Sequence, residues 1–474
     1  MARVLLVQPP VYPRELFSQG VKTSASVTPP LGLAYIASHL RAHGHECRII
    51  DGIAEPIGLD HLAEIACRYD VVGVTVVTAY ALRAIELVAA IKARWPSPPV
   101  IVGGPHVSAL PESLLARGAD MAVIGEGEET MRELVECLAA GASRERLRAV
   151  RGIGFQEEGI YHYTGPRPPI DPLDTVPLPA RDLLPMGRYH SSIARASAQP
   201  SLPLLASRGC GGACSFCSRH TFGTKPRYFS VGRIVEEFFL LRDKYGARDV
   251  AVFDDNFVAD EETASSVCHA LRSRGFDLTW SVEARVDSVN RSLLSTLRNS
   301  GCTYIAYGIE SGSQRILDRI NKQVTKQQIR ETIAVTKEAG LLVRGYFMLG
   351  FPTETATEME ETIRFAIELD VDVASFTLVV PLPGTLEYRR AQRSGTFDRD
   401  YYLKGIMPEF HFLDWPAYVP EGMTAETLLG IHRSAYKRYY FRPGVIIKKL
   451  ASVRSVGDVW ALMRGAYTLA RKAA

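Results

Sequence analysis

The sequence predicts an α/β protein: an N-terminal Rossmann-like, doubly wound parallel sheet, then a partial (β/α)6 barrel, then a mainly helical C-terminal region. Two series of short Val- and Ile-rich runs alternate with helical patterns, one before residue 140 and one after residue 203. Such runs are typical of parallel strands that helices cover on both faces. A proline-rich stretch separates the two series. At about 150 residues per domain, the 474 residues correspond to two or three domains.

The first series is expected to form a domain over residues 1–145. A doubly wound sheet binds its ligand beyond the carboxyl ends of its strands. Gly103, Gly104 and Gly125 stand at those ends, where a backbone without Cβ atoms can approach a bulky ligand closely. No Gly-x-Gly-x-x-Gly follows the first strand, which disfavours a dinucleotide. The predicted strands are Arg3–Gln8, Cys47–Gly52, Val71–Val77, Val100–Gly104 and Met121–Gly125, and the predicted helices include Leu31–Ala42, Ala81–Arg94 and Glu129–Leu138.

Residues 146–200 are expected to form a hairpin and a linker. The segment Gly152–Tyr163 predicts a small hairpin that turns at Glu158-Gly159. Seven prolines then follow between Pro166 and Pro185. This density forbids a regular helix and interrupts a sheet, so the segment predicts a stiff, extended connector.

The second series predicts a barrel over residues 201–385. Six strand–helix repeats suit a partial or full barrel of parallel strands, whose chemistry is expected at the carboxyl ends of the strands. The predicted strands are Leu204–Arg208, Asp249–Asp254, Leu278–Val286, Tyr304–Ile309, Val343–Leu349 and Ala374–Val380, and the predicted helices include Ile234–Tyr245, Glu261–Arg274 and Lys326–Ala339.

The last part, residues 386–474, is expected to be mainly helical and is rich in aromatic residues. From Gly430 onward it holds ten Lys and Arg residues against one acid, Asp458. This basic segment is either a solvated helix face or a surface for a phosphate or an acidic membrane. The aromatic residues either form plain core or shape a substrate pocket; they include Tyr401, Tyr402, Phe410, His411, Phe412, Trp415, Tyr439, Tyr440, Phe441 and Trp460.

Composition narrows the choice of partner and compartment. The net charge is +3, so no nucleic-acid partner is expected. No run reaches 18 apolar residues, and the first residues lack the apolar core and cleavage site of a signal peptide. A cytoplasmic location is therefore expected, and membrane association is not, apart from what the basic C-terminal segment leaves open.

Three of the eight cysteines cluster within eight residues. Cys210, Cys214 and Cys217 follow the first predicted barrel strand with the spacing C-x3-C-x2-C. Three thiolates on one loop suit the soft iron of an iron–sulfur cluster, and three ligands leave one iron of a four-iron cluster open. Structural zinc prefers four ligands. His220, three residues past Cys217, leaves a Cys3His zinc site as the alternative.

This loop closely resembles that of the radical S-adenosylmethionine enzymes, and the resemblance covers nearly all of residues 200–385. It implies that Cys210, Cys214 and Cys217 hold a 4Fe-4S cluster whose open iron binds S-adenosylmethionine. The second barrel strand ends in Asp254-Asp255, where many members carry Gly-Gly-Glu. The residues that the resemblance places against S-adenosylmethionine are Phe216, Asp255, Glu283, Arg285, Glu310, Ser311 and Gly350.

Simpler functions for several of these side chains remain open at this point. Glu310 can accept hydrogen bonds from both ribose hydroxyls, or it can be a structural acid. Arg285 offers a fork that suits a carboxylate, or it pairs with Glu283 inside the barrel. Asp254 can cap the helix that follows its strand.

Residues 1–140 resemble the cobalamin-binding domain that precedes the barrel in one large subfamily of these enzymes, the class B methylases. The segments that carry this resemblance begin at Thr28, Gly103 and Gly125. The resemblance implies cobalamin contacts from Thr75, Thr78, Gly103, Gly104, His106, Gly125 and Glu126.

Some of these contacts have alternatives as well. The Asp-x-His-x-x-Gly signature is absent, so that motif supplies no histidine as lower axial ligand. His106 can instead be a turn histidine that packs against the Gly-Gly loop. Thr75 and Thr78 can cap the helix that begins near Ala81. The domain can also be retained without its cofactor.

The resemblance implies an enzyme that reductively cleaves S-adenosylmethionine to a 5′-deoxyadenosyl radical, which abstracts hydrogen from a small-molecule substrate. Cobalamin-dependent methyl transfer to an unactivated carbon in secondary metabolism is the expected outcome. An external one-electron reductant of the flavodoxin or ferredoxin type is expected. The alternatives are dehydration, ring contraction or cyclisation with the cobalamin domain empty or only redox-active, and an iron–sulfur sensor. No residue is assigned to proton or hydrogen transfer, and a sugar, polyketide, peptide, terpenoid or tetrapyrrole substrate is compatible.

Overall fold

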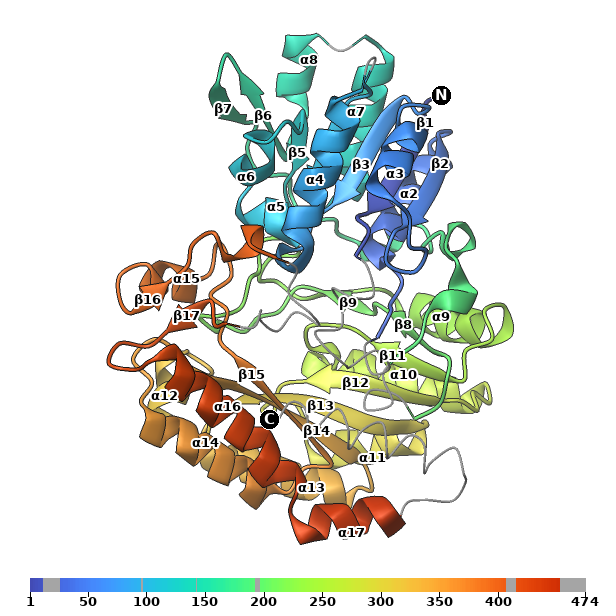
Figure 1. Ribbon diagram of the computed structural model, residues 1–474. Helices are drawn as coiled ribbons and strands as arrows, with labels where there is room; N and C mark the ends of the chain where they lie inside the picture. Colours follow the sequence, from blue (N-terminus) through green and yellow to red (C-terminus); the bar gives the residue numbers. More distant parts are fainter. Residues whose placement is uncertain (12–25, 95–96, 142, 192–196, 406–414, 452–474) are drawn as a thin grey trace.

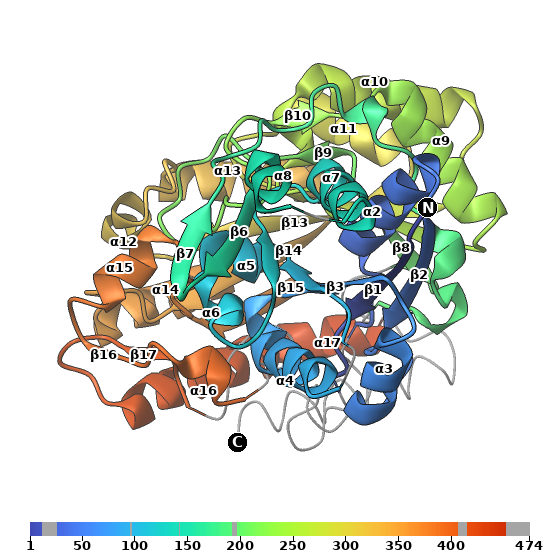
Figure 2. The same ribbon diagram turned by 90° about the horizontal axis from the view of Figure 1, so that it is seen from above.

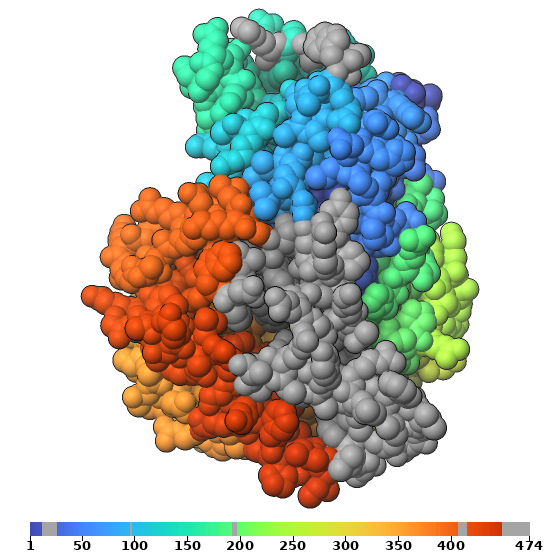
Figure 3. Space-filling model, viewed as in Figure 1, coloured from blue at the N-terminus to red at the C-terminus, as the bar shows by residue number. Residues whose placement is uncertain are grey.

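Two open, largely parallel sheets, one above the other in Figure 1, carry the elements that position the functional site. The computed structural model describes residues 1–11, 26–94, 97–141, 143–191, 197–405 and 415–451. The N-terminal sheet lies at the top, the barrel sheet lies below it, and the C-terminal helices cover the lower left (Figures 1 and 3). The α/β class expected from the sequence is confirmed.

The N-terminal sheet is doubly wound, as predicted. Its strand order is β2-β1-β3-β4-β5-β6-β7, and the strands from β1 to β5 run parallel. Helices α2 and α7 cover one face, and α3 and α4 cover the other (Figure 2). The bounds are β1 Arg3–Gln8, β2 Glu46–Asp51, β3 Val71–Thr75, β4 Val100–Gly103, β5 Met121–Val123, α2 Leu31–Ala42, α3 Leu59–Ala66, α4 Ala81–Lys92, α5 Pro105–Ala109, α6 Glu112–Leu115, α7 Glu128–Ala139 and α8 Arg144–Ala149.

The continuous apolar run of β1 follows from burial on both faces. Val4 and Leu6 pack into the cluster that includes α2 and α7, whereas Leu5 and Val7 pack into the cluster that includes α3 and α4. Because successive side chains of a strand point to opposite faces, a strand covered on both sides is apolar at every position.

The predicted hairpin extends this sheet. Strand β6 (Ile153–Glu157) pairs antiparallel with β5, and β7 (Ile160–Tyr163) pairs antiparallel with β6. Glu158 and Gly159 between them have φ angles of 52° and 78°. Two successive left-handed residues match the right-handed twist of the strands that they join. The hairpin expected from Gly152–Tyr163 is confirmed.

The proline-rich connector contains only short 3-10 turns among its described residues, at Leu173–Thr175, Arg181–Leu183 and Met186–Arg188. The interruption of helix and sheet by proline is therefore confirmed. Arg181 anchors the connector to the barrel: its fully buried guanidinium pairs with Glu237 at 2.6 Å and donates to the Pro203 carbonyl at 2.8 Å. A paired and hydrogen-bonded charge is the form in which burial is tolerated.

The barrel sheet has six parallel strands in the order β15-β14-β13-β12-β11-β8, and β8 and β15 remain at opposite edges. It is therefore a partial barrel. The bounds are β8 Ser201–Leu204, β11 Asp249–Val252, β12 Thr279–Ala284, β13 Cys302–Glu310, β14 Leu342–Leu349, β15 Val373–Leu378, α9 Val231–Asp243, α10 Glu261–Ser273, α11 Arg291–Asn299, α12 Gln314–Arg319, α13 Lys326–Glu338 and α14 Ala356–Leu369.

The single strand predicted at Leu204–Arg208 is wrong, because the structure divides it. Strand β8 ends at Leu204, and β9 (Ser207–Arg208) pairs antiparallel with β10 (Arg227–Tyr228) in a separate ribbon. The buried Asp254 carboxylate accepts a bond from the Ala206 N–H at 2.8 Å and from the Ser207 hydroxyl at 2.6 Å. These bonds take the place of sheet pairing, so the chain leaves the barrel at this point.

The C-terminal region is mainly helical in its described part, as predicted. It contains α15 Leu386–Ala391, α16 Ala425–Tyr440, α17 Pro443–Ala451 and the short pair β16 Thr396–Phe397 and β17 Tyr418–Val419. Within the described residues, no helix combines the length and the apolar character needed to cross a bilayer. Phe410, His411, Phe412, Asp458 and Trp460 lie outside the described residues.

Helix α16 covers the free edge of β15 with tyrosine hydroxyls. The Tyr440 hydroxyl accepts from the Ala374 N–H at 3.1 Å and donates to the Ala374 carbonyl at 2.7 Å. The Tyr436 hydroxyl bonds in the same way to the Phe376 N–H and carbonyl, at 3.3 and 2.9 Å. A strand at an edge exposes backbone groups that need partners. The two phenols take the place of a missing neighbouring strand.

We expect Tyr440→Phe to lower the free energy of unfolding by about 1–3 kcal/mol, because two backbone groups of Ala374 lose their partner. Adding Tyr436→Phe should enlarge the loss. The measurement is denaturant unfolding of each variant, and Tyr163→Phe, at a residue that is 44% exposed, is the control. Equal midpoints for Tyr440→Phe and Tyr163→Phe would contradict this account of the edge.

Candidate functional site

The three clustered cysteines lie on one loop at the carboxyl end of β8. This cysteine loop comprises residues 209–226, and the β9–β10 ribbon closes its base. Cys214 is buried, Cys210 is half-buried and Cys217 is exposed. Gly209 starts the loop with φ +87°, and a Cβ atom there would lie 2.7 Å from the Lys225 carbonyl oxygen. Only glycine allows the two ends of the loop to approach this closely.

Hydrogen bonds from two later parts of the chain fasten the loop. The Ser215 N–H donates to the Ile320 carbonyl at 2.9 Å, and the Asn321 amide donates to the Ala213 carbonyl at 3.0 Å. The Ser215 hydroxyl donates to the fully buried Glu387 carboxylate at 2.5 Å. The region after β13 and helix α15 therefore hold the loop in one conformation.

Arg285 places a positive charge against the cysteines. Its Nη1 donates to the Cys214 sulfur at 3.4 Å, while Nη2 donates to the Lys322 carbonyl at 2.7 Å. A Cβ atom at Gly212 would lie 3.1 Å from that Nη1, so glycine makes room for the guanidinium. A cation beside a sulfur favours the thiolate form that binds metal.

The pairing of Glu283 with Arg285, the simpler alternative, is not what the structure shows. Arg285 pairs with Asp287 at 2.8 Å. Glu283 instead accepts a hydrogen bond from the Tyr346 hydroxyl at 3.1 Å.

The zinc alternative also lacks its fourth ligand. His220 directs Nε2 to the Gly384 carbonyl at 3.2 Å rather than to the cysteine sulfurs. In the described part of the chain, no three His, Cys, Asp or Glu side chains converge as ligands of a single ion. Ligands of an iron–sulfur cluster each hold a different iron and so do not need to converge. The donor set fits three corners of a cluster.

Glu310 is held next to the cysteine loop by a buried ion pair. Its Oε1 lies 2.9 Å from the Lys322 ammonium, and both side chains are nearly inaccessible. A Cβ atom at Gly308 would lie 2.4 Å from that Oε1, which explains the glycine two positions earlier. The Lys322 ammonium lies 6.0 Å above the centre of the Phe216 ring. Ser311, fully buried, shares a 3.1 Å hydrogen bond with a threonine hydroxyl of α14.

Gly350 and Glu354 form a turn on the other side of Phe216. The N–H groups of Gly350 and Phe351 both donate to Glu354 Oε2, at 2.6 and 2.9 Å. Gly350 has φ +92°, and the Phe351 ring lies 5.8 Å from the Phe216 ring. Sequence reasoning did not single out Glu354, although this acid closes the turn that follows β14. Burial raises the pKa of Glu354 to about 8, and its Oε1 has no partner among the described residues.

The two aspartates that end β11 have different surroundings. Asp254 is buried and fastens Ala206 and Ser207, as described above, and Asp260 rather than Asp254 caps α10. Asp255 lines the cavity between the two sheets. Helix capping by Asp254, the alternative left open by the sequence, is therefore wrong.

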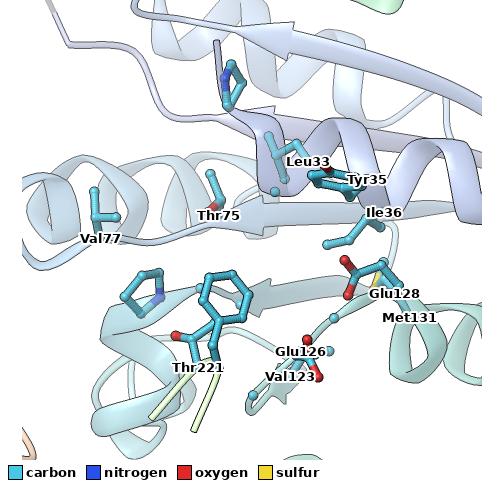
Figure 4. Close-up of a pocket in the computed structure, with 18 of the residues that line it drawn as sticks. Leu33, Tyr35, Ile36, Thr75, Val77, Val123, Glu126, Glu128, Met131 and Thr221 are labelled. Atoms are coloured by element: carbon cyan, nitrogen blue, oxygen red, sulfur yellow. The ribbon is translucent and has the colours of Figure 1, made fainter. Parts of the chain in front are cut away.

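A cavity of about 440 Å³ lies beyond the carboxyl ends of the N-terminal strands (Figure 4). Its far wall comes from the cysteine loop and from Asp255, and Thr221 enters from the side opposite α2. Its surface is mostly apolar, as in sites for large organic ligands. The predicted residues that line it are Thr75, Gly103, Gly104, Gly125 and Glu126, and the apolar lining includes Leu33, Ile36, Val77, Val123 and Met131.

Glycine at the cavity edge is a steric requirement. Gly104 has φ +98°, and a Cβ atom there would lie 3.0 Å from both Thr75 Oγ1 and the Val76 carbonyl oxygen. The backbone of β4 can therefore turn close to β3 and leave the space beyond it open. The cradle leaves room for a bulky organic ligand.

Thr78 and His106 are not among the residues that line this cavity. His106 is fully buried, and its ring nitrogens bond to Thr78 Oγ1 at 3.1 Å and to Ser113 Oγ at 3.0 Å. Burial lowers the pKa of His106 to about 4, so the ring is neutral. The simpler function as a packed turn histidine is the one observed. Tyr80, not a threonine, stands at the start of α4.

Glu126 lines the cavity, but its carboxylate is directed to the other domain. It pairs with Arg208 at 2.8 Å and Arg227 at 2.9 Å, and it accepts the Ile170 N–H at 2.8 Å. Glu128 pairs with Arg208 at 2.5 Å. We call Glu126, Glu128, Arg208 and Arg227 the interdomain clamp. All four side chains are at least nine-tenths buried, and Arg208 is two residues before Cys210.

Arg208→Met should lower the free energy of unfolding by about 3–5 kcal/mol, because two buried carboxylates lose their partner. Retention of cobalamin should fall as well, since Arg208, Glu126 and Glu128 all line the cavity. Thermal unfolding and visible absorption of bound cobalamin measure the two effects.

The control is Arg291→Met, which removes an exposed arginine of α11 that pairs with the exposed Glu338. This change should cost at most about 1 kcal/mol. Equal losses in the two variants would contradict the clamp.

The raised pKa of Glu354 predicts a pH dependence. The unfolded chain titrates near 4.5 and the folded protein near 8. The protonated carboxyl therefore stabilises the fold below about pH 4.5, and this stabilisation is lost as the pH rises through about 8. Glu354→Gln should remove the decline between these values, measured by denaturant unfolding from pH 5 to pH 9. Glu338→Gln, at an exposed residue, should leave it; parallel curves for wild type and Glu354→Gln would refute the assignment.

Comparison with known proteins agrees with this geometry. Residues 19–135 match the B12 binding domain, and residues 204–366 match the Radical SAM superfamily. The chain is 35% identical over 454 residues to the uncharacterized methyltransferase PH0819 of Pyrococcus horikoshii, with 94% of each chain covered. It is 26% identical to the anaerobic magnesium-protoporphyrin IX monomethyl ester cyclase of Rubrivivax gelatinosus, over 92% of this chain and 77% of that protein.

A solved structure shares the whole fold. The cobalamin-dependent S-adenosylmethionine radical enzyme OxsB, solved with aqua-cobalamin and S-adenosylmethionine bound, superposes with a TM-score of 0.77 at 18% identity. The superposition covers 100% of this chain and 71% of that one.

Proposed function

We propose that this chain, which belongs to the radical S-adenosylmethionine enzymes with an N-terminal B12-binding domain, transfers a methyl group to an unactivated carbon of a small-molecule substrate. Its cofactors are a 4Fe-4S cluster, S-adenosylmethionine and cobalamin. Together these groups supply the electron, the 5′-deoxyadenosyl radical and the methyl group, and the protein supplies binding, orientation and exclusion of water.

One observation carries the proposal: a single cavity joins the B12-binding domain to the cysteine loop. Gly103 and Gly125 line it from the N-terminal sheet, and Ser218 and Arg219 line it from the cysteine loop. A ligand held by the N-terminal domain therefore faces the loop whose cysteines bind the cluster. Methyl transfer to a radical formed beside the cluster requires this juxtaposition.

For cobalamin, we assign direct contacts to Thr75, Gly103, Gly104 and Gly125, which line the cavity. Glu126 acts instead as a positioning residue through the interdomain clamp. Thr78 and His106 support the wall from behind and do not reach the ligand. Because both His106 nitrogens are already hydrogen-bonded, this side chain offers cobalt no lower ligand.

For S-adenosylmethionine, we assign Phe216 of the cysteine loop, together with Glu310, Ser311 and Gly350 at the carboxyl ends of β13 and β14, to the wall of the site. Their support lies in the buried Glu310–Lys322 pair and the contact between the Phe216 and Phe351 rings. We assign Asp255, Glu283 and Arg285, near the carboxyl ends of β11 and β12, to the same site. Of these, Arg285 also bonds to Cys214, one of the cluster ligands.

The proposal includes an external one-electron reductant of the flavodoxin or ferredoxin type. The sequence holds a single cluster of cysteines, so it offers no second cysteine-ligated cluster that could relay electrons to the first. The substrate is a small molecule. A cyclisation without methyl transfer is the second candidate, because one relative is named as a cyclase.

Anaerobic turnover of candidate substrates with methyl-labelled S-adenosylmethionine separates these two outcomes. We expect the label in the product, detected by mass spectrometry, and a product without label would favour cyclisation or elimination. Cys214→Ala should abolish formation of 5′-deoxyadenosine, since one iron of the cluster loses its ligand. Cys67→Ala, in the N-terminal domain, is the matched control and should retain it. Cleavage by Cys214→Ala at the wild-type rate would remove this cysteine from the site.

A further inference from the structure

The inner face of the barrel sheet remains accessible to water and polar. On β14, Val343, Phe347 and Leu349 are fully buried against the helices. The alternating side chains point to the inner face, because successive residues of a strand face opposite ways. Neighbouring strands contribute to the same inner face. Its half-buried residues are Glu283 on β12, Tyr346 and Met348 on β14, and Ser375 and Thr377 on β15. The interior is therefore not filled by a hydrophobic core.

Arg344 stands on this inner face without an acidic partner. Arg344 is only 7% exposed. Nε donates to the Ser375 hydroxyl at 3.3 Å, and the guanidinium lies 5.3 Å above the centre of the Tyr346 ring. Among the described residues Arg344 forms no ion pair, and its Nη1 and Nη2 have no acceptor. The two Nη groups are not enclosed by protein, and Glu283 and the neighbouring tyrosines favour the charged form. The fork is therefore charged and free to bond a ligand.

The nearest acid on this face is held away from Arg344. Glu283 and Arg344 are both register partners of Ala306, on opposite sides of β13. Glu283 uses Oε1 to accept the Tyr346 hydroxyl at 3.1 Å. Glu283 and Arg344 therefore flank Ala306 on the same face of the sheet, with only this small side chain between them.

We propose that Arg344 anchors a substrate subsite that receives an oxyanion, either a carboxylate or a phosphate, of the substrate. The two Nη groups form a fork that matches two oxygens of either group. This inference rests on the proposed function, since it names the class of small molecule that the barrel binds.

Binding of benzoate and of inorganic phosphate to the protein reconstituted with cluster, cobalamin and S-adenosylmethionine tests the subsite. Ligand-observed NMR titrations give the two dissociation constants. Wild type should bind at least one of the two anions, and the better one identifies the substrate group as planar carboxylate or tetrahedral phosphate. Arg344→Met should weaken that binding at least about tenfold, as expected for loss of a charge-assisted pair of hydrogen bonds. Arg344→Lys should restore part of it.

The matched control is Arg330→Met, which removes an arginine paired with Glu368 on the outer surface of the barrel. It should leave both dissociation constants unchanged. Should Arg344→Met prove unfolded, Arg344→Gln and Arg344→Lys provide the comparison.

Three results would overturn the inference: wild type binds neither anion, Arg344→Met binds as wild type does, or Arg344→Met loses affinity for S-adenosylmethionine instead. The last would place Arg344 in the cofactor site. None of these titrations needs turnover, so a failure of the methyl-transfer experiment and a failure of this one are distinguishable.

Discussion

The interdomain clamp is the interaction on which the rest of the site depends. Glu126 and Glu128 follow the last parallel strand of the N-terminal sheet, and Arg208 and Arg227 come from the ribbon that closes the cysteine loop. Because all four charges are buried, each is tolerated only while its partner stays in place. The clamp therefore determines where the B12-binding domain lies relative to the cluster ligands. Hydrogen abstraction supplied from the cluster side and methyl delivery supplied from the B12-binding domain would have to reach the same substrate carbon, which requires this fixed relation.

Buried carboxyl groups also hold several loops in place at the carboxyl ends of the barrel strands. Asp254 ends the pairing of β8, Glu354 closes the turn after β14, and Glu387 holds the cysteine loop from α15. In each case the carboxylate oxygens accept N–H or O–H groups of a loop that has left the sheet. Loops without such acceptors bury unsatisfied backbone groups or remain exposed to water. The loops at the carboxyl ends of the barrel strands can therefore keep one conformation although they have no regular secondary structure. Arg344 differs from these groups, since it forms no ion pair among the described residues and its Nη groups make no hydrogen bond.

Much of this organisation was predictable from local sequence. Helix α2 has the predicted bounds, the hairpin at Glu158-Gly159 follows from turn chemistry, and the spacing of Cys210, Cys214 and Cys217 indicates the cluster. The strand predicted at Leu204–Arg208 was wrong, because Asp254, which is distant in sequence, accepts hydrogen bonds from Ala206 and Ser207. Glu126 and His106 belong to matching motifs, but a motif carries no information about the direction of a side chain. Their partners, Arg208 and Ser113, are supplied by tertiary packing.

The amino-acid sequence by itself determined the order of the two parallel sheets, the proline connector between them, and which residues can hold iron and approach a corrin. These features depend on near neighbours along the chain: periodicity, turn residues and cysteine spacing. Only the tertiary structure decided that one cavity joins the two domains, that Glu126 pairs across them, and that Arg344 forms no ion pair among the described residues. Each of these depends on which charged groups meet in a space of low dielectric constant, and residues distant in sequence decide that.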